Sequence, residues 1–77
     1  MRERIKRVMA RIFGVPIAAV PDDADVNGFA QWDSLRHLEL MVALEMEFGV
    51  RISSEAMVEL LSLEAIEEYV RGQATPA

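Results

Sequence analysis

Apolar residues recur every three or four positions along the chain, a spacing that predicts amphipathic α-helices. The first helix ends where Gly14 interrupts the pattern. Its apolar face contains Ile5, Val8, Met9, Ile12 and Phe13. A second helix is predicted to begin at Asp33 or Ser34 and to run to about Phe48, where Gly49 provides a left-handed stop.

Two shorter helices are predicted after the second. The third begins at Ser53 or Ser54 and reaches Leu61. Ser62 then caps a fourth helix, which Gly72 ends. Valine and isoleucine nowhere alternate over the length of a strand, so we do not expect a sheet.

The connection between the first two helices, residues 14–32, is long and contains prolines, a glycine and several aspartates. We expect it to be functional or to contain a short helix of its own. Its apolar residues should pin it to the core; these are Ile17, Val20, Val26 and Phe29. Asp22, Asp23 and Asp25 lack the glycine and closing glutamate of an EF-hand loop, which favours a solvated acidic turn over a calcium site.

A length of 77 residues allows one domain with a modest core. The predicted fold is therefore all-α: a small four-helix bundle with a short third helix and a long loop between helices one and two. We expect a single domain over residues 1–72 and a flexible C-terminal tail over residues 73–77.

Cysteine is absent, which excludes disulfides and thiolate metal sites and fits a reducing compartment. No apolar run approaches the roughly 18 residues of a membrane span, and the N-terminus lacks the pattern of a secretory signal. We therefore expect a cytoplasmic monomer without membrane insertion.

The formal net charge of −5 is unevenly distributed, because the first helix is basic and the rest of the chain is acidic. This balance disfavours a nucleic-acid partner and favours a basic protein partner. Arg4, Arg7 and Arg11 share one face of the first helix. We interpret that face as solvated, with a second docking patch as the alternative.

The second helix has two apolar stripes instead of one. One contains Leu40, Met41, Leu44 and Phe48, and the other contains Leu35, Leu38, Val42 and Met46. A central helix would bury both stripes. A bundle of this size has little room for such a helix, so we expect the stripe through Leu35, Leu38 and Val42 to stay partly exposed for a partner.

Ser34 stands at the start of this helix, where free backbone N–H groups and the helix dipole favour a phosphate. A phosphoester on its hydroxyl would therefore be tolerated. The tripeptide Asp-Ser-Leu is weak support when taken alone, because serine is also a common helix cap.

The surrounding sequence is more specific. Residues 32–40 (WDSLRHLEL) and the later run LEMEFGV resemble the acyl carrier protein family, whose hallmark is Asp-Ser-Leu at the head of the second helix. The resemblance extends over the whole chain, from an apolar first helix to a final helix ending near Val70. It implies that Ser34 carries a 4′-phosphopantetheine arm donated by coenzyme A, with acyl groups held on it as thioesters.

The resemblance also implies partners and roles. A phosphopantetheinyl transferase would modify Ser34, with Asp33 orienting its contacts, and acyl-loading and acyl-processing enzymes would dock on the second helix. Apolar docking contacts are expected from Leu35, Leu38 and Val42. Glu39 and Glu45 are expected to meet basic residues of these partners. The protein itself would be a non-catalytic carrier.

Three departures in the second helix point to a specialised carrier. Arg36, His37 and Met46 make it less acidic than in carriers of housekeeping fatty-acid synthesis. The cargo could be a fatty acid, a polyketide or another specialised acyl group. The alternative function is a small helical interaction module without a prosthetic group.

Two residues near Ser34 allow other interpretations. His37 follows three positions later, but a Ser–His hydrolase needs a substrate cleft and an oxyanion site from separate elements, so we interpret His37 as solvated or partner-facing. Trp32 either covers the entrance for cargo, contacts a partner, or packs the loop against the bundle.

Overall fold

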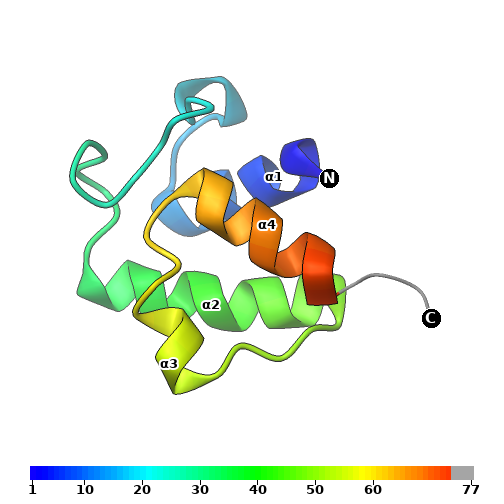
Figure 1. Cartoon of the computed structure of the whole chain (residues 1–77). Helices are drawn as coiled ribbons and strands as arrows, with labels where there is room; N and C mark the ends of the chain where they lie inside the picture. Colours follow the sequence, from blue (N-terminus) through cyan, green and yellow to red (C-terminus); the bar gives the residue numbers. More distant parts are fainter. Residues whose placement is uncertain (74–77) are drawn as a thin grey trace.

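The computed structural model describes residues 1–73 and contains four α-helices and one short 3-10 helix. The elements in chain order are α1 (Arg2–Phe13), η1 (Ile17–Ala19), α2 (Ser34–Phe48), α3 (Ser54–Met57) and α4 (Leu63–Gln73). The predicted all-α bundle with a short third helix and a long first loop is confirmed (Figure 1).

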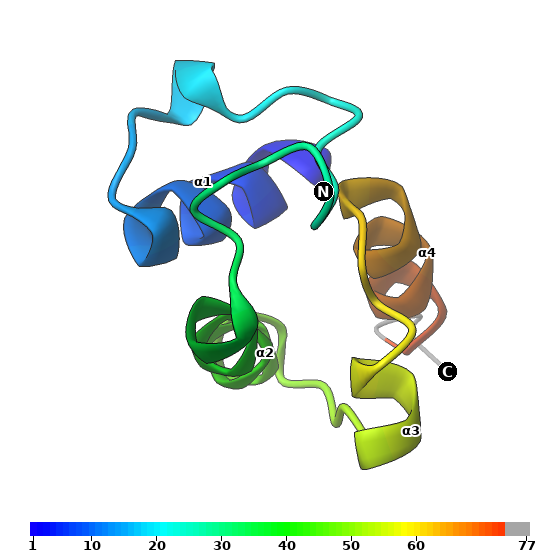
Figure 2. The same ribbon diagram turned by 90° about the vertical axis from the view of Figure 1, so that its left-hand side faces the viewer.

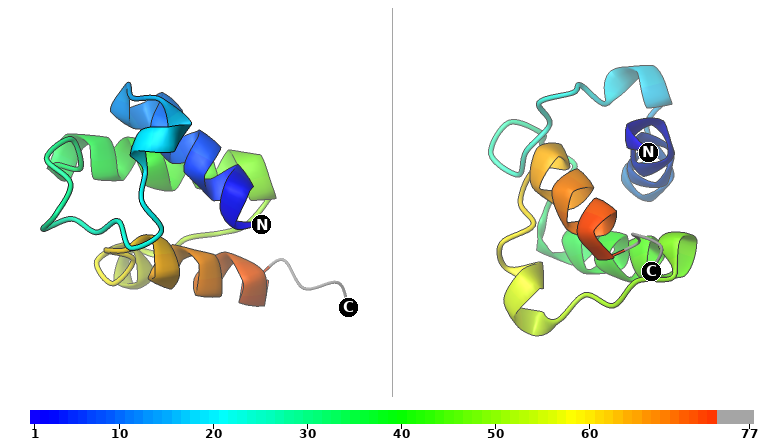
Figure 3. Two further views of the ribbon diagram at one scale, coloured as in Figure 1. Left: turned by 90° about the horizontal axis from the view of Figure 1, so that it is seen from above. Right: turned by 45° about the vertical axis from the view of Figure 1, so that its right-hand side comes forward.

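The three long helices surround one core. Figure 2 looks along α2 and shows α1 on one side of the core and α4 on another, with α3 beside α2. Seen from above, α1 crosses obliquely over α2 (left panel of Figure 3). The loop between α1 and α2 arches over α1 and enters α2 at the end that begins with Ser34.

Glycines end the first two helices as predicted. Gly14 has φ 70° and Gly49 has φ 65°, the left-handed conformation that a side chain disfavours. The N–H of each glycine donates to a carbonyl four residues earlier, Ala10 and Glu45 respectively. These bonds satisfy backbone acceptors that the helix ends would leave open.

The core buries one face of each long helix. Side chains with no exposed surface come from α1, α2 and α4; they are Ile5, Met9, Leu40, Leu44, Leu63, Ile66 and Val70. The loop contributes Val20 and Trp32, while Ile17, Val26 and Phe29 pack against the core with partial exposure. The predicted anchoring of the loop is confirmed.

The third helix is shorter than predicted, because it ends at Met57 and not at Leu61. The residues that follow pair with the long loop: the N–H of Val26 donates to the carbonyl of Leu61, and the N–H of Leu63 donates to that of Ala24. This isolated antiparallel bridge requires extended backbone near Leu61, which a helix cannot provide. Local periodicity gives no sign of such a pairing.

The fourth helix continues past Gly72, which does not end it, and includes Gln73. Gly72 does not adopt a left-handed conformation, so it does not terminate the hydrogen-bonded turn. The helix therefore reaches one residue into the predicted tail, and residues 74–77 of that tail lie outside the described residues. No helix within residues 1–73 is long and apolar enough to cross a membrane.

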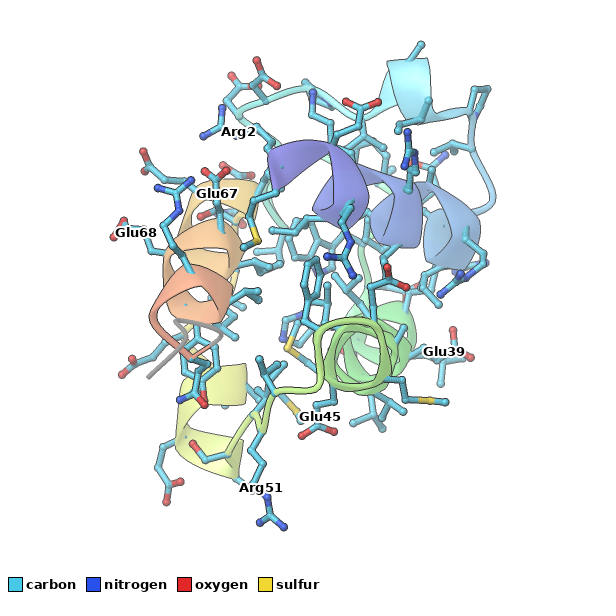
Figure 4. The ribbon with its side chains drawn as sticks, turned by 90° about the vertical axis from the view of Figure 1, so that its right-hand side faces the viewer. Arg2, Glu39, Glu45, Arg51, Glu67 and Glu68 are labelled. Atoms are coloured by element: carbon cyan, nitrogen blue, oxygen red, sulfur yellow. The ribbon has the colours of Figure 1, made fainter. Side chains whose placement is uncertain are left out.

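One carboxylate is buried where α1 meets α4. Glu67 is 7 % exposed, and its Oε1 accepts a hydrogen bond of 2.7 Å from Nη2 of Arg2 (Figure 4). Arg71 forms a second ion pair of 3.3 Å with Oε2. The hydrogen bond from Arg2 lowers the pKa of Glu67 below its ordinary value of 4.5.

The depressed pKa of Glu67 predicts an acid-sensitive stability. The contribution of its ionised form is present above pH 4.5 and is lost as the pH falls through the lower folded pKa. Glu67→Gln should lower the thermal midpoint at neutral pH and flatten its decline in acid. Thermal unfolding followed by circular dichroism from about pH 7 to about pH 3 measures both effects. Glu68→Gln, an exposed neighbour, is the control, and equal acid profiles for the two variants would contradict the assignment.

Candidate functional site

Ser34 is the first residue of α2, and its side chain is exposed. Asp33 caps the helix, since its Oδ1 accepts a hydrogen bond of 2.8 Å from the backbone N–H of Arg36. The hydroxyl of Ser34 is therefore not the cap, and no group within residues 1–73 hydrogen-bonds to it. It faces solvent at the positive end of a helix of 15 residues.

The cap keeps a negative charge beside this hydroxyl. The hydrogen bond from the backbone N–H of Arg36 lowers the pKa of the Asp33 carboxyl, and the Arg36 guanidinium adds an ion pair of 3.0 Å. The guanidinium offsets the charge of Asp33 near the helix start. A phosphoester at Ser34 would thus lie near the positive end of the helix dipole and the Arg36 guanidinium. The nearby Asp33 carboxylate already has partners.

A hollow of about 350 Å³ adjoins Ser34. It is lined by Val26, Trp32, Asp33, Ser34, His37 and Leu61, which come from the long loop, the first turn of α2 and the segment after α3. Its walls are mainly apolar, so an acyl chain or the apolar part of an arm attached to Ser34 could enter it. Val26 and Leu61 were missed as site residues because the backbone pairing that joins their segments has no signal in the local sequence.

Trp32 and His37, which both line this hollow, form a hydrogen-bonded pair. Trp32 is 4 % exposed, and its Nε1–H donates to Nδ1 of His37 over 2.9 Å. An indole N–H can only donate, so Nδ1 must be the acceptor and Nε2 carries the proton. Nε2–H then donates to the carbonyl of Met57 over 2.8 Å. The pair joins the long loop, α2 and the end of α3.

These contacts decide between the earlier interpretations of both residues. Trp32 packs the loop against the bundle and also contacts the ring of Phe13, with centroids 5.5 Å apart. The interpretation of His37 as solvated or partner-facing is wrong, because a buried indole N–H needs an acceptor and His37 supplies it. Both ring nitrogens of His37 are engaged within the protein, which leaves no free base for Ser34.

Two of the three aspartates of the long loop have structural partners. Oδ1 of Asp25 accepts hydrogen bonds from the N–H groups of Asn27 and Gly28, and Asp22 pairs with Lys6. Within residues 1–73 no group of three or more acidic, histidine or cysteine side chains could hold a metal ion.

The two apolar stripes of α2 have different environments. Leu40, Met41 and Leu44 are buried, whereas the opposite stripe is exposed: Leu35 by 65 %, Leu38 by 50 %, Val42 by 49 % and Met46 by 81 %. The expected exposure of this stripe is confirmed. Two further exposed apolar residues, Val58 and Leu61, follow α3 and had no clear periodic signal in the sequence.

The two glutamates expected to contact partners lie in different settings. Glu39 is exposed and points away from the bundle in Figure 4. Glu45 is half-buried, and its Oε2 accepts a hydrogen bond of 2.8 Å from the N–H of Ile52. This bond ties the loop after α2 to the helix, a function that helical spacing alone does not indicate.

Known proteins resemble the chain over most of its length. Residues 3–70 match the family profile described as "Phosphopantetheine attachment site". Polyketide-8 synthase acyl carrier protein 2 of Streptomyces avermitilis is 34 % identical over 69 residues, which are 90 % of this chain and 79 % of the relative. A chain in the solved structure of the ishigamide ketosynthase/chain length factor superposes with a TM-score of 0.72 at 23 % identity, covering 95 % of this chain and 92 % of that chain, and thus shares the fold.

The Trp32–His37 pair predicts a stability loss in a His37 variant. His37→Ala removes the acceptor of a buried N–H and should lower the free energy of unfolding by about 1–3 kcal/mol. Urea denaturation followed by circular dichroism measures this loss. The control is Glu39→Ala, an exposed change on the same helix that should cost less than about 0.5 kcal/mol. Equal losses for the two variants would refute the structural role of His37.

Substitutions in the exposed stripe of α2 should change the stability of the protein less than substitutions on the buried face. Leu38→Asp should reduce the free energy of unfolding by less than about 1 kcal/mol, because half of the side chain is already in water. Leu40→Ala should cost about 2–5 kcal/mol, because Leu40 has no exposed surface. A larger loss in Leu38→Asp than in Leu40→Ala would show that the stripe belongs to the core.

Proposed function

The chain belongs to the phosphopantetheine-binding acyl carrier proteins, and we propose that Ser34 is the residue that carries the 4′-phosphopantetheine arm. The observation that carries this proposal is the exposed hydroxyl of Ser34 at the first turn of α2, which Asp33 leaves free by taking the cap. Residues 33–35 read Asp-Ser-Leu at the place where the family has its attachment motif.

The amino-acid composition agrees with a thiol that is supplied by an attached group. Because the sequence has no cysteine, it cannot form a thioester with its own side chains. A phosphopantetheinyl transferase would transfer the arm from coenzyme A to the Ser34 hydroxyl and release the nucleotide part of coenzyme A, and the bound arm would supply the thiol that holds acyl groups. The chain's own part is to present the Ser34 hydroxyl, to stabilise the phosphodiester with the N-terminus of α2 and to offer a docking surface. The protein is a carrier and not an enzyme.

Polyketide intermediates are the cargo that we propose. The support is the likeness to an acyl carrier protein of a polyketide synthase and the presence of Arg36 and Met46 in α2. These residues depart from the more acidic helix of carriers in fatty-acid synthesis, so fatty-acid intermediates are the less favoured cargo. We also propose that the protein acts as a monomer in the cytoplasm, and the absence of cysteine fits that reducing compartment.

The exposed stripe of α2 is the proposed docking face for acyl-loading and acyl-processing enzymes. Leu35, Leu38 and Val42 follow Ser34 along one side of the helix, so an enzyme that covers them also reaches the arm. Glu39 supplies a negative charge beside this stripe, and Asp33 lies next to the modified residue. We leave Glu45 out of the docking face because its carboxylate is bound to Ile52.

Intact-mass measurement tests the attachment site. After incubation with coenzyme A and a broadly specific phosphopantetheinyl transferase, the wild-type chain should gain the mass of one 4′-phosphopantetheine group. Ser34→Ala should gain nothing. Ser54→Ala, which removes an exposed hydroxyl from the first residue of α3, should be modified like the wild type.

Two outcomes would overturn this assignment. An unmodified wild-type chain beside a modified control carrier would favour an interaction module without a prosthetic group. Modification of Ser34→Ala would move the attachment to another residue.

A further inference from the structure

A second feature of the surface is an apolar groove between α1 and α2, with a volume of about 630 Å³. Its lining comes from both helices and consists of Arg11, Ile12, Leu38, Glu39, Val42, Ala43 and Met46. Leu38, Val42 and Met46 are each about half exposed or more, so the groove widens the stripe of α2 toward α1. The floor is apolar and the two charged residues stand on opposite walls.

The cations of α1 fall into two groups. Arg2, Arg4 and Lys6 are engaged within the protein, since each forms an ion pair with an acidic side chain of another element. Arg4 also lies over the ring of Phe48, 4.6 Å from its centroid, and donates to the carbonyl of Glu47. These contacts hold α1 in place.

Arg7 and Arg11 are different. Both are exposed, and neither has an ion pair with any residue from 1 to 73. Arg11 forms part of the groove, and Arg7 lies one helical turn away on the same face of α1. Glu39 on the opposite wall does not pair with Arg11. The groove therefore has a positive rim on α1 and a negative rim on α2.

We propose that this groove is a docking site for an apolar protein segment that carries a carboxylate against Arg11. Apolar side chains of the partner would cover Leu38, Val42 and Ile12, while its Asp or Glu would pair with Arg11 and approach Arg7. A partner with this chemistry complements the charges of the groove. It differs from a partner that offers only basic residues to the acidic side chains of α2. The proposal rests on the proposed function in that the partner is an enzyme acting on the carrier's cargo.

The charges favour a protein over a membrane surface. Two arginines beside an exposed apolar stripe could also attract anionic lipid, but each contributes only about 1 kcal/mol, and the chain has a net charge of −5. Glu39 on the same groove would oppose such a surface. A carboxylate on one flank of a protein segment, by contrast, can meet the positive rim alone.

Charge reversal in a matched pair of peptides tests the proposal. The probes are two amphipathic helical peptides with the same leucine stripe; one has Glu along a single flank and the other has Lys at those positions. Titrations into the full-length, isotope-labelled chain are followed by amide chemical shifts. The wild type should bind the Glu peptide about threefold more tightly, with shifts at Ile12, Leu38 and Val42.

Variants then locate the charge. Arg11→Glu should reverse the preference toward the Lys peptide, and Arg7→Glu should weaken the preference for the Glu peptide. Arg51→Glu, which reverses an exposed charge on the loop after α2, should bind like the wild type. The peptides are titrated into the unmodified chain, so the result does not depend on attachment at Ser34, and a failure here and a failure of the attachment assay remain distinguishable.

Three results would overturn the proposal. Equal affinity for the two peptides would show that the partner's carboxylate does not contribute to binding. Chemical-shift changes confined to other surfaces would show that the groove is not the docking site. Binding of the chain to vesicles of anionic phospholipid, lost in Arg11→Glu, would assign the rim to a membrane instead.

Discussion

The whole arrangement depends on how little apolar surface a chain of 77 residues can bury. Helix α2 contributes Leu40, Met41 and Leu44 to a core shared with α1 and α4, and this core has no room for the other side of the helix. Leu38 and Val42 therefore remain half exposed on the helix that begins with Ser34. The limit on burial thus leaves the proposed attachment residue and the proposed docking face on the same helix.

Much of the fold follows from the sequence because its signals are local. The left-handed stops at Gly14 and Gly49, the cap at Asp33 and the two stripes of α2 all depend on spacing within one helix. The shortened α3 could not be foreseen, because backbone pairing between residues 24–26 and residues 61–63 ends it, and those segments are distant in sequence.

The same distinction applies to the site. The place of Ser34 at the start of α2 and the exposed stripe could be predicted from the motif and the helical period, but the structural bonds of His37 and Glu45 could not. Each of these side chains satisfies a backbone or indole group on another element, and such a partner has no fixed spacing in the sequence. Side chains of α2 that face the loop and α3 are thus held by hydrogen bonds within the protein, whereas the stripe through Leu35, Leu38 and Val42 faces solvent.

The position of Trp32 has an optical consequence. It is the sole tryptophan of the chain, it is buried, and it lines the hollow next to Ser34. A chemical group that enters the hollow would therefore come close to Trp32. The tryptophan fluorescence of the protein therefore comes from one reporter beside the proposed attachment residue, and a shift in its emission would distinguish a chain that shelters its cargo from one that leaves it in solvent.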